Sequence, residues 1–125
     1  MERIRHIIYF KSYFLDYYNE QNEKVKEKID YVLYVISVAE RIPKKFFDHI
    51  TGTNGLYEIR VEVKSNIFRF FCCFDEGKVV VVFNGFQKKS QKTPTTEIDK
   101  ALKIMKQYFE QKQKQKLNES KKRKY

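Results

Sequence analysis

The chain has 125 residues, of which 42% are hydrophobic and 16% aromatic, and this composition is typical of one globular domain rather than of a disordered segment. The formal net charge is +10, but residues 111–125 contribute +6 of it through seven Lys or Arg against one Glu. Residues 1–110 carry 19 basic and 15 acidic side chains, which leaves +4. Any basic site in this body must therefore be local.

The N-terminal region contains neither the pattern of a secretory leader nor a transmembrane-length apolar run. Charged residues such as Arg5, Lys11 and Asp16 interrupt each apolar stretch. We therefore expect a cytoplasmic protein with no membrane partner.

The cysteines and histidines do not indicate a metal or redox site. Cys72 and Cys73 are adjacent, and neighbours on a strand point to opposite faces, so we expect no disulfide between them. His6 and His49 are isolated, and the cysteine pair lacks zinc-site spacing. We expect no metal and no cofactor.

The N-terminal half predicts one strand followed by two helices. The β-rich stretch Ile4–Phe10 predicts a strand, and Ser12 can cap a short aromatic helix over 12–19. From Glu23 to Ile42 apolar residues recur at helical spacing, and Pro43 ends this amphipathic helix. A loop containing Lys44 and Lys45 then runs to Gly55.

The C-terminal half predicts three antiparallel strands and a last helix. The strands are expected at Leu56–Val63, Ile67–Phe74 and Val79–Phe86, because their connections are too short for parallel crossovers. The residues after Pro94 predict a helix as far as Glu110. We therefore predict an α+β fold with one domain over residues 1–112, and a frayed or disordered basic tail over residues 113–125.

Two arginines are predicted to share one face of the sheet. With a two-residue hairpin loop at 65–66, Arg60 and Arg69 are diagonal neighbours, Glu62 opposes Arg69, and Arg69 faces solvent. A register shift of one residue would move Arg69 to the other face. A two-residue loop at 76–77 would add three residues of the next strand to this face, namely Val80, Val82 and Asn84.

The segment Gly85–Pro94, GFQKKSQKTP, is the second basic feature. It holds Lys88, Lys89 and Lys92 after the last strand with almost no counter-charge. Cationic donors on such a support are suited to binding phosphate. The alternative interpretation is a solvated lysine-rich connector beside an ordinary Glu62–Arg69 surface pair.

Three of these motifs, in this order, resemble the RelE/HigB superfamily of bacterial type II toxins. Gly55–Arg60 looks like the second-strand motif, and Ile67–Phe71 looks like the third-strand aromatic-Arg-aromatic motif. Gly85–Pro94 is similar to the loop of the phage-derived, HigB-related branch, where Phe-x-Lys-Lys and Lys-Thr-Pro recur. The resemblance covers about residues 3–110 and implies a RelE-like fold, with a small antiparallel sheet, two N-terminal helices and one C-terminal helix.

The resemblance also implies a function and a set of roles. It implies a ribosome-dependent mRNA endoribonuclease (mRNA interferase), silenced by a cognate antitoxin that we expect to be a helix-turn-helix protein. Arg60 matches a basic residue that contacts the scissile phosphate, and Arg69 matches the arginine that stabilises the transferring phosphate. Lys88 or Lys89 matches the basic residue after the last strand. The chain departs from relatives at Glu58, where some place a lysine, and it has no Tyr or His at the far end of the loop.

The chemistry needs no metal, because RNA carries its own nucleophile in the 2′-hydroxyl. Glu58 or a neutral lysine is the candidate base, and Lys88 or Lys89 is the candidate acid. The candidate RNA contacts are four further lysines, Lys44, Lys45, Lys64 and Lys92. Two other functions remain open, a ParE-like gyrase inhibitor and a catalytically silent module that binds RNA or an antitoxin.

Overall fold

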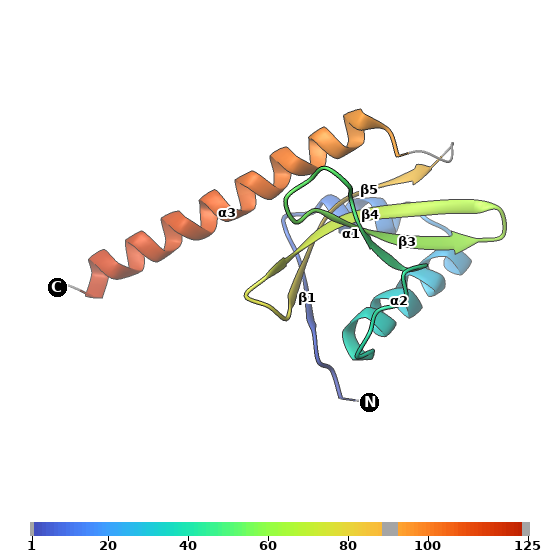
Figure 1. The fold of residues 1–125 in the computed structure, drawn as a ribbon, viewed down its shortest axis with the longest axis horizontal. Helices are drawn as coiled ribbons and strands as arrows, with labels where there is room; N and C mark the ends of the chain where they lie inside the picture. Colours follow the sequence, from blue (N-terminus) through green and yellow to red (C-terminus); the bar gives the residue numbers. More distant parts are fainter. Residues whose placement is uncertain (1, 89–92, 124–125) are drawn as a thin grey trace.

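The computed structural model describes residues 2–88 and 93–123 (Figure 1). Five strands and three helices follow one another as β1 (His6–Tyr9), α1 (Tyr13–Asn19), α2 (Glu23–Val38), β2 (Phe47–His49), β3 (Tyr57–Val63), β4 (Asn66–Asp75), β5 (Val79–Lys88) and α3 (Thr95–Arg123). The strands form one sheet in the order β1-β5-β4-β3-β2. The chain therefore has the predicted α+β class, with the two shorter helices before the β3–β5 meander and the long helix after it. Its sheet is mixed and not antiparallel throughout as expected, because β1 runs parallel to β5.

The sheet separates two hydrophobic clusters. Residues of α1 and α2 pack on one face, against buried side chains that include Ile59, Phe70 and Val82. The opposite face carries Phe71 and Phe83, which pack under α3. Alternation along a strand produces this division, because successive side chains point to opposite faces. The division also separates Cys72 from Cys73, which are both buried, free thiols in different clusters, as predicted.

The first strand is confirmed, although it is shorter than expected. It pairs in parallel with β5, from His6 opposite Val79 to Tyr9 opposite Val82. Ser12 is the N-cap residue of α1, as predicted, but its side chain makes no capping hydrogen bond.

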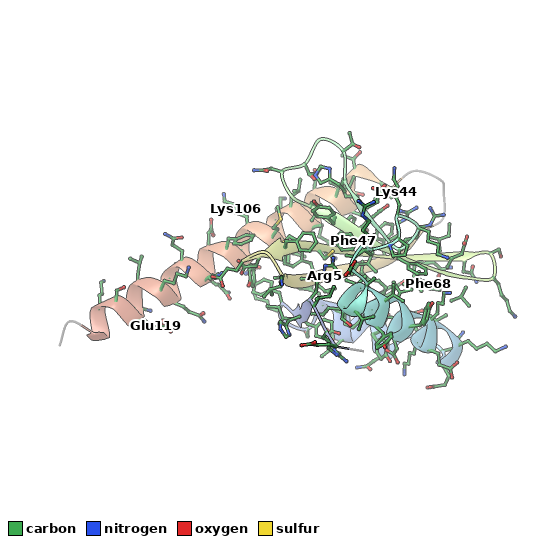
Figure 2. The ribbon with its side chains drawn as sticks, turned by 60° about the horizontal axis from the view of Figure 1, so that its bottom comes forward. Arg5, Lys44, Phe47, Phe68, Lys106 and Glu119 are labelled. Atoms are coloured by element: carbon green, nitrogen blue, oxygen red, sulfur yellow. The ribbon has the colours of Figure 1, made fainter. Side chains whose placement is uncertain are left out.

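Helix α2 ends at Val38 and not at Ile42 as predicted. Arg5 lies at this helix end (Figure 2), and its guanidinium donates hydrogen bonds to three carbonyls there, those of Ile36, Ala39 and Glu40. The last carbonyls of a helix have no partner within it. Because a side chain distant in sequence supplies these donors, the helix ends before Pro43 forces it to.

Strand β2 lies in a segment that was predicted to be a loop. Its three residues pair antiparallel with β3, from Phe47 opposite Ile59 to His49 opposite Tyr57. A strand of this length is too short to show an alternating pattern in the sequence.

Strand β5 extends to Lys88, two residues beyond its predicted end. Gly85 therefore lies within the sheet, opposite Phe70, and not in a loop. A Cβ at Gly85 would come within 2.5 Å of the Phe70 ring. Glycine at this position is what allows the Phe70 side chain to pack over the strand.

Helix α3 continues to Arg123, beyond its predicted end at Glu110 and through most of the basic tail, while residues 124–125 lie outside the described part of the chain. Its 29 residues correspond to a length of about 44 Å. The helix crosses the sheet and its C-terminal part projects beyond it, where Glu119 lies (Figures 1 and 2). No helix among the described residues is both long enough and apolar enough to cross a membrane.

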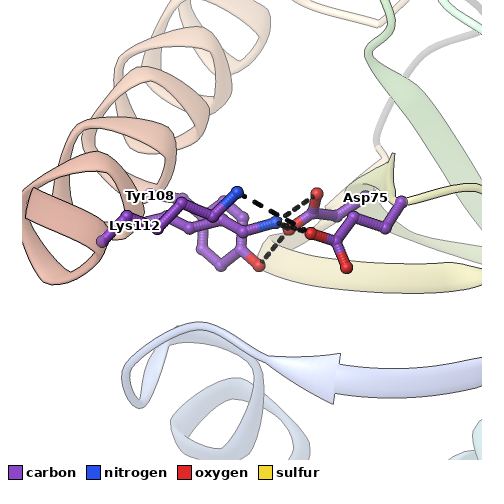
Figure 3. A network of polar contacts seen from close by, with 5 residues as sticks. Asp75, Tyr108 and Lys112 are labelled. Atoms are coloured by element: carbon purple, nitrogen blue, oxygen red, sulfur yellow. Dashed lines mark hydrogen bonds and ion pairs between the residues drawn. The ribbon is translucent and has the colours of Figure 1, made fainter. Parts of the chain in front are cut away.

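A polar network at the β4–β5 turn attaches the middle of α3 to the sheet (Figure 3). Tyr108 donates a hydrogen bond to Asp75 at 2.6 Å, and Lys112 lies 2.8 Å from Asp75 and 3.0 Å from Glu76. Burial raises the pKa of Asp75, but the hydrogen bonds from Lys112 and Tyr108 outweigh this effect and hold that pKa below its usual value. Burial and the Asp75 carboxylate raise the pKa of Tyr108 to about 12.

Candidate functional site

The β3–β4 hairpin places Arg60 directly opposite Arg69. Its two-residue turn is at residues 64–65 and not at 65–66, because Val63 pairs with Asn66. This register differs from the predicted one by two residues, so both arginines stay on one face. Glu62 opposes Ile67 and does not oppose Arg69 as predicted.

Arg69 is buried, so the expectation that it faces solvent is wrong. Only 5% of Arg69 and 8% of Glu58 are exposed, and the Arg69 guanidinium donates a hydrogen bond to the Glu58 carboxylate. Glu58 lies two residues before Arg60 on β3, which puts it diagonal to Arg69 on the same face. Desolvation lowers the pKa of Arg69, with the carboxylate of Asp48 acting against this effect. An arginine nevertheless stays charged in proteins, so the pair is ionic.

Thr93 connects this ion pair to the segment before α3. Its hydroxyl donates to the second carboxylate oxygen of Glu58 at 3.2 Å. Glu58 is thereby held from two sides, by Arg69 from β4 and by Thr93 from the segment that leads into the last helix. As a candidate base, Glu58 would first have to release Arg69.

Three buried polar atoms near this site lack a hydrogen-bond partner among residues 2–88 and 93–123. They are Nε of Arg69 and both side-chain amide atoms of Asn84, a residue that is only 3% exposed. Buried polar groups in native proteins are normally hydrogen-bonded. Asn84 lies in a β-bulge, where two residues of β5 oppose Phe71.

Two of the β5 residues predicted for the arginine face lie on the other face. Asp75 pairs with Val79, so the connection has three residues and not two. A change of one residue reverses the face of every side chain in the strand. Val80 and Val82 consequently pack beneath α1 and α2.

The candidate lysines fall into three groups. Lys45 lines a groove together with Arg60, while Lys44 is exposed in the loop before β2 and Lys64 is exposed at the β3–β4 turn. The backbone of Lys88 closes β5 opposite Ile67. Lys89 and Lys92 lie outside the described residues.

The opposed arginines define what this face can do chemically. Like charges directly opposite each other on paired strands are destabilising unless something neutralises them. Glu58 neutralises Arg69, whereas Arg60 forms no ion pair within the described ranges 2–88 and 93–123. Arginine presents several donors to an oxyanion. The face is therefore suited to binding an anion beside Arg60. That anion can replace Glu58 as the ion-pair partner of Arg69.

Thr93 and Asp48 were not among the predicted site residues, and Asn84 was predicted to lie on the arginine face but was given no role there. Thr93 lies in the Lys-Thr-Pro motif, where only the lysines were considered. Asn84 is the single amide in the apolar run of β5, and a lone polar residue in a buried strand is a detectable signal. Asp48 belongs to β2, which has no sequence signal of its own.

Comparison with protein families gives a match over most of the chain. Residues 16–106, which are more than half of the chain, match the family described as Phage derived protein Gp49-like (DUF891). This range includes both opposed arginines and the Gly85–Pro94 segment. No curated protein matches the chain significantly.

Proposed function

Because the chain belongs to the Gp49-like family of phage-derived proteins, which is part of the RelE/HigB-like toxin clan, we propose that it is the toxin of a type II toxin–antitoxin system. Its activity in this proposal is ribosome-dependent cleavage of mRNA. The observation that carries the proposal is the pair of directly opposed arginines, Arg60 and Arg69, on one sheet face. A protein that only binds another protein has no need to gather phosphate ligands there. The proposal includes a RelE-like arrangement and a place in the HigB-related branch.

The proposed reaction uses the 2′-hydroxyl of the RNA as nucleophile. This oxygen attacks the adjacent phosphorus, a 2′,3′-cyclic phosphate forms, and the bond to the leaving 5′-oxygen breaks. Arg60 binds the phosphate, and Arg69 stabilises the charge that builds up on its oxygens. Glu58 accepts the proton of the 2′-hydroxyl, and Lys88 or Lys89 protonates the leaving oxygen.

In this mechanism the Glu58–Arg69 pair is a resting arrangement. The incoming phosphate replaces the carboxylate as the partner of Arg69, which frees Glu58 to act as a base. Thr93 stays as a donor to Glu58 and keeps the carboxylate on the site face. Alignment by the ribosome provides the geometry that the isolated protein lacks.

The proposed inhibitor is an antitoxin of the helix-turn-helix class. It neutralises the toxin by covering the arginine face or by holding α3 away from it. A complex in which both the face and α3 stay exposed while toxicity is lost would contradict this part of the proposal.

The test is cleavage of a defined mRNA in a reconstituted translation system, read by primer extension. The wild-type protein should cut mRNA only on ribosomes, and Arg60→Gln should slow cleavage about 10²–10³-fold, as expected for loss of one transition-state donor. Lys106→Gln, an exposed charge change on α3, is the matched control and should cut at the wild-type rate.

A second measurement separates the alternatives. After induction in cells, pulse labelling should show protein synthesis falling before DNA synthesis. Arrest of DNA synthesis first, with accumulation of gyrase–DNA adducts, would replace this proposal with the ParE-like function. Absence of both effects would favour the catalytically silent module.

A further inference from the structure

A groove of about 330 Å³ lies at the edge of β3, beside the arginine face. It is lined by residues of α2, of the loop before β2 and of β3, namely Lys28, Lys45, Phe46, Arg60 and Glu62. The pairing between β2 and β3 reaches only to Phe47 opposite Ile59, and beyond it the Arg60 amide donates to the Phe46 carbonyl at 2.8 Å. Among the described residues, the part of β3 after Arg60 therefore has no paired strand on this edge, and the groove forms there.

The Phe46 ring positions two of the cations in the groove. The Lys45 ammonium lies 4.9 Å and the Lys28 ammonium 5.7 Å from the ring centroid. Lys28 also lies 5.2 Å from the Tyr31 ring, which packs edge-on against Phe46. Phe46 itself is 9% exposed and fixed in the core. Cation–π contacts with a fixed ring restrict two long side chains that would otherwise be free.

The groove has an excess of positive charge. Three cations, Lys28, Lys45 and Arg60, face one carboxylate, that of Glu62. None of the three cations forms an ion pair within the part of the chain that the structure describes. Converging cations without a counter-charge indicate a site for an anionic group.

Arg60 belongs both to this groove and to the arginine face, because it lines the groove and opposes Arg69. An anion in the groove is therefore next to an anion at Arg69, and a chain of regularly spaced phosphates satisfies both positions. The groove has the size of a small-ligand pocket, which is enough room for one phosphate group of such a chain.

We propose that this groove binds a backbone phosphate of single-stranded RNA, adjacent to the scissile phosphate at Arg60 and Arg69. The inference rests on the proposed function and extends it: the substrate strand crosses the edge of β3, and Lys28 and Lys45 are phosphate-binding residues. They hold the strand and take no part in the chemistry.

The test is the salt dependence of RNA binding. The probe is a short fluorescein-labelled 2′-O-methyl RNA of mixed sequence, which lacks the nucleophile and so cannot be cut, and binding is read by fluorescence anisotropy. Each phosphate contact on a single strand contributes about 0.7 to the slope of log K against log salt. Because the groove holds one phosphate, the double variant Lys28→Gln/Lys45→Gln should lower the slope by about 0.7, so that between about 50 and 200 mM salt the wild type loses roughly 2.6-fold more affinity than the variant.

The matched control removes two exposed charges elsewhere, in Lys78→Gln/Lys106→Gln, and should keep the wild-type slope. Lys45→Gln alone, at an exposed position, should lower the slope in the same direction by a smaller amount, and this variant is used if the double variant does not fold. An unchanged slope in the groove variants, or an equal change in the control, overturns the inference.

This experiment separates the two proposals. If the wild type cuts mRNA on ribosomes while the groove variants keep the wild-type slope, only the groove inference fails. If the wild type neither binds the probe nor cuts mRNA, both fail. Binding of an acidic peptide in the groove with no effect of these substitutions on RNA affinity would also overturn the inference and would assign the groove to a protein partner.

Discussion

Substitution of Arg69 by methionine should destabilise the protein far more than an ordinary surface substitution. The side chains of Arg69 and Glu58 are only 6% and 11% exposed, and each is the other's counter-ion. Among residues 2–88 and 93–123, removing the arginine leaves the buried carboxylate with Thr93 as its one side-chain donor. Breaking a buried pair from one side costs about 3–5 kcal/mol. Since the free energy of unfolding of a domain is roughly 5–15 kcal/mol, this single change removes a large fraction of it.

A double-mutant cycle isolates this cost. Glu58→Leu should destabilise by a similar amount, because it leaves the Arg69 guanidinium buried without its carboxylate. The double variant Arg69→Met/Glu58→Leu should recover most of the loss, since an apolar pair of similar size is often as stable as a buried ion pair. The free energies are measured by urea unfolding followed by circular dichroism, with the midpoint and the slope fitted separately.

The control is Arg60→Met on the opposite strand. Arg60 is half-buried and forms no ion pair within the described residues, so its loss should change the free energy of unfolding by only about 0.5 kcal/mol. If Arg69→Met changes stability as little as Arg60→Met, with an unchanged slope, the reasoning from burial is refuted. Loss of activity in a fully stable Arg69→Met protein would then restore the original expectation of a solvent-facing catalytic arginine.

Three further outcomes are expected. Tyr108→Phe should lower the free energy of unfolding by about 0.5–1.5 kcal/mol, measured by urea unfolding. Because the pKa of Tyr108 is raised to about 12, the stability that its hydrogen bond to Asp75 provides is complete below the ordinary tyrosine pKa near 10 and is lost as the pH rises through about 12. A difference in stability between wild type and variant that does not decline at alkaline pH would contradict the network. Gly85→Ala should destabilise by about 1–3 kcal/mol in thermal unfolding, because the new methyl group meets the Phe70 ring, and an unchanged melting temperature would mean that Phe70 can move aside. Truncation after Lys112 should leave the free energy of unfolding unchanged. It should weaken RNA binding mainly at low salt, with a shallower dependence of log K on log salt. Unfolding of the truncated protein would show that the projecting part of α3 supports the core.

The sequence by itself determined most of the element order. Apolar spacing predicted α2 and the start of α3, and alternation between short turns predicted β3, β4 and β5. It also placed Arg60 and Arg69 on one face. These features follow from local periodicity, because the side-chain direction repeats every two residues in a strand and every 3.6 residues in a helix.

Local periodicity does not determine the lengths of the turns, and the turn lengths set the strand register. At residues 64–65 the turn moved by one residue, which shifted the register by two and kept the arginines together. At residues 76–78 the turn gained one residue, which reversed the face of Val80 and Val82. The segments around both turns are short and polar and fit turns of two or three residues, so the sequence alone does not fix the turn lengths.

Only the tertiary structure shows which residues bury the candidate site and which long-range contacts hold the helix ends in place. Arg69 is buried in an ion pair with Glu58, which also accepts a hydrogen bond from Thr93, and α2 ends early because Arg5 supplies its missing donors. Helix α3 continues past its apolar stripe, where Asp75 at a distant turn binds Lys112. These contacts join residues far apart in sequence, and their energy depends on burial and on partner geometry, which no local pattern contains.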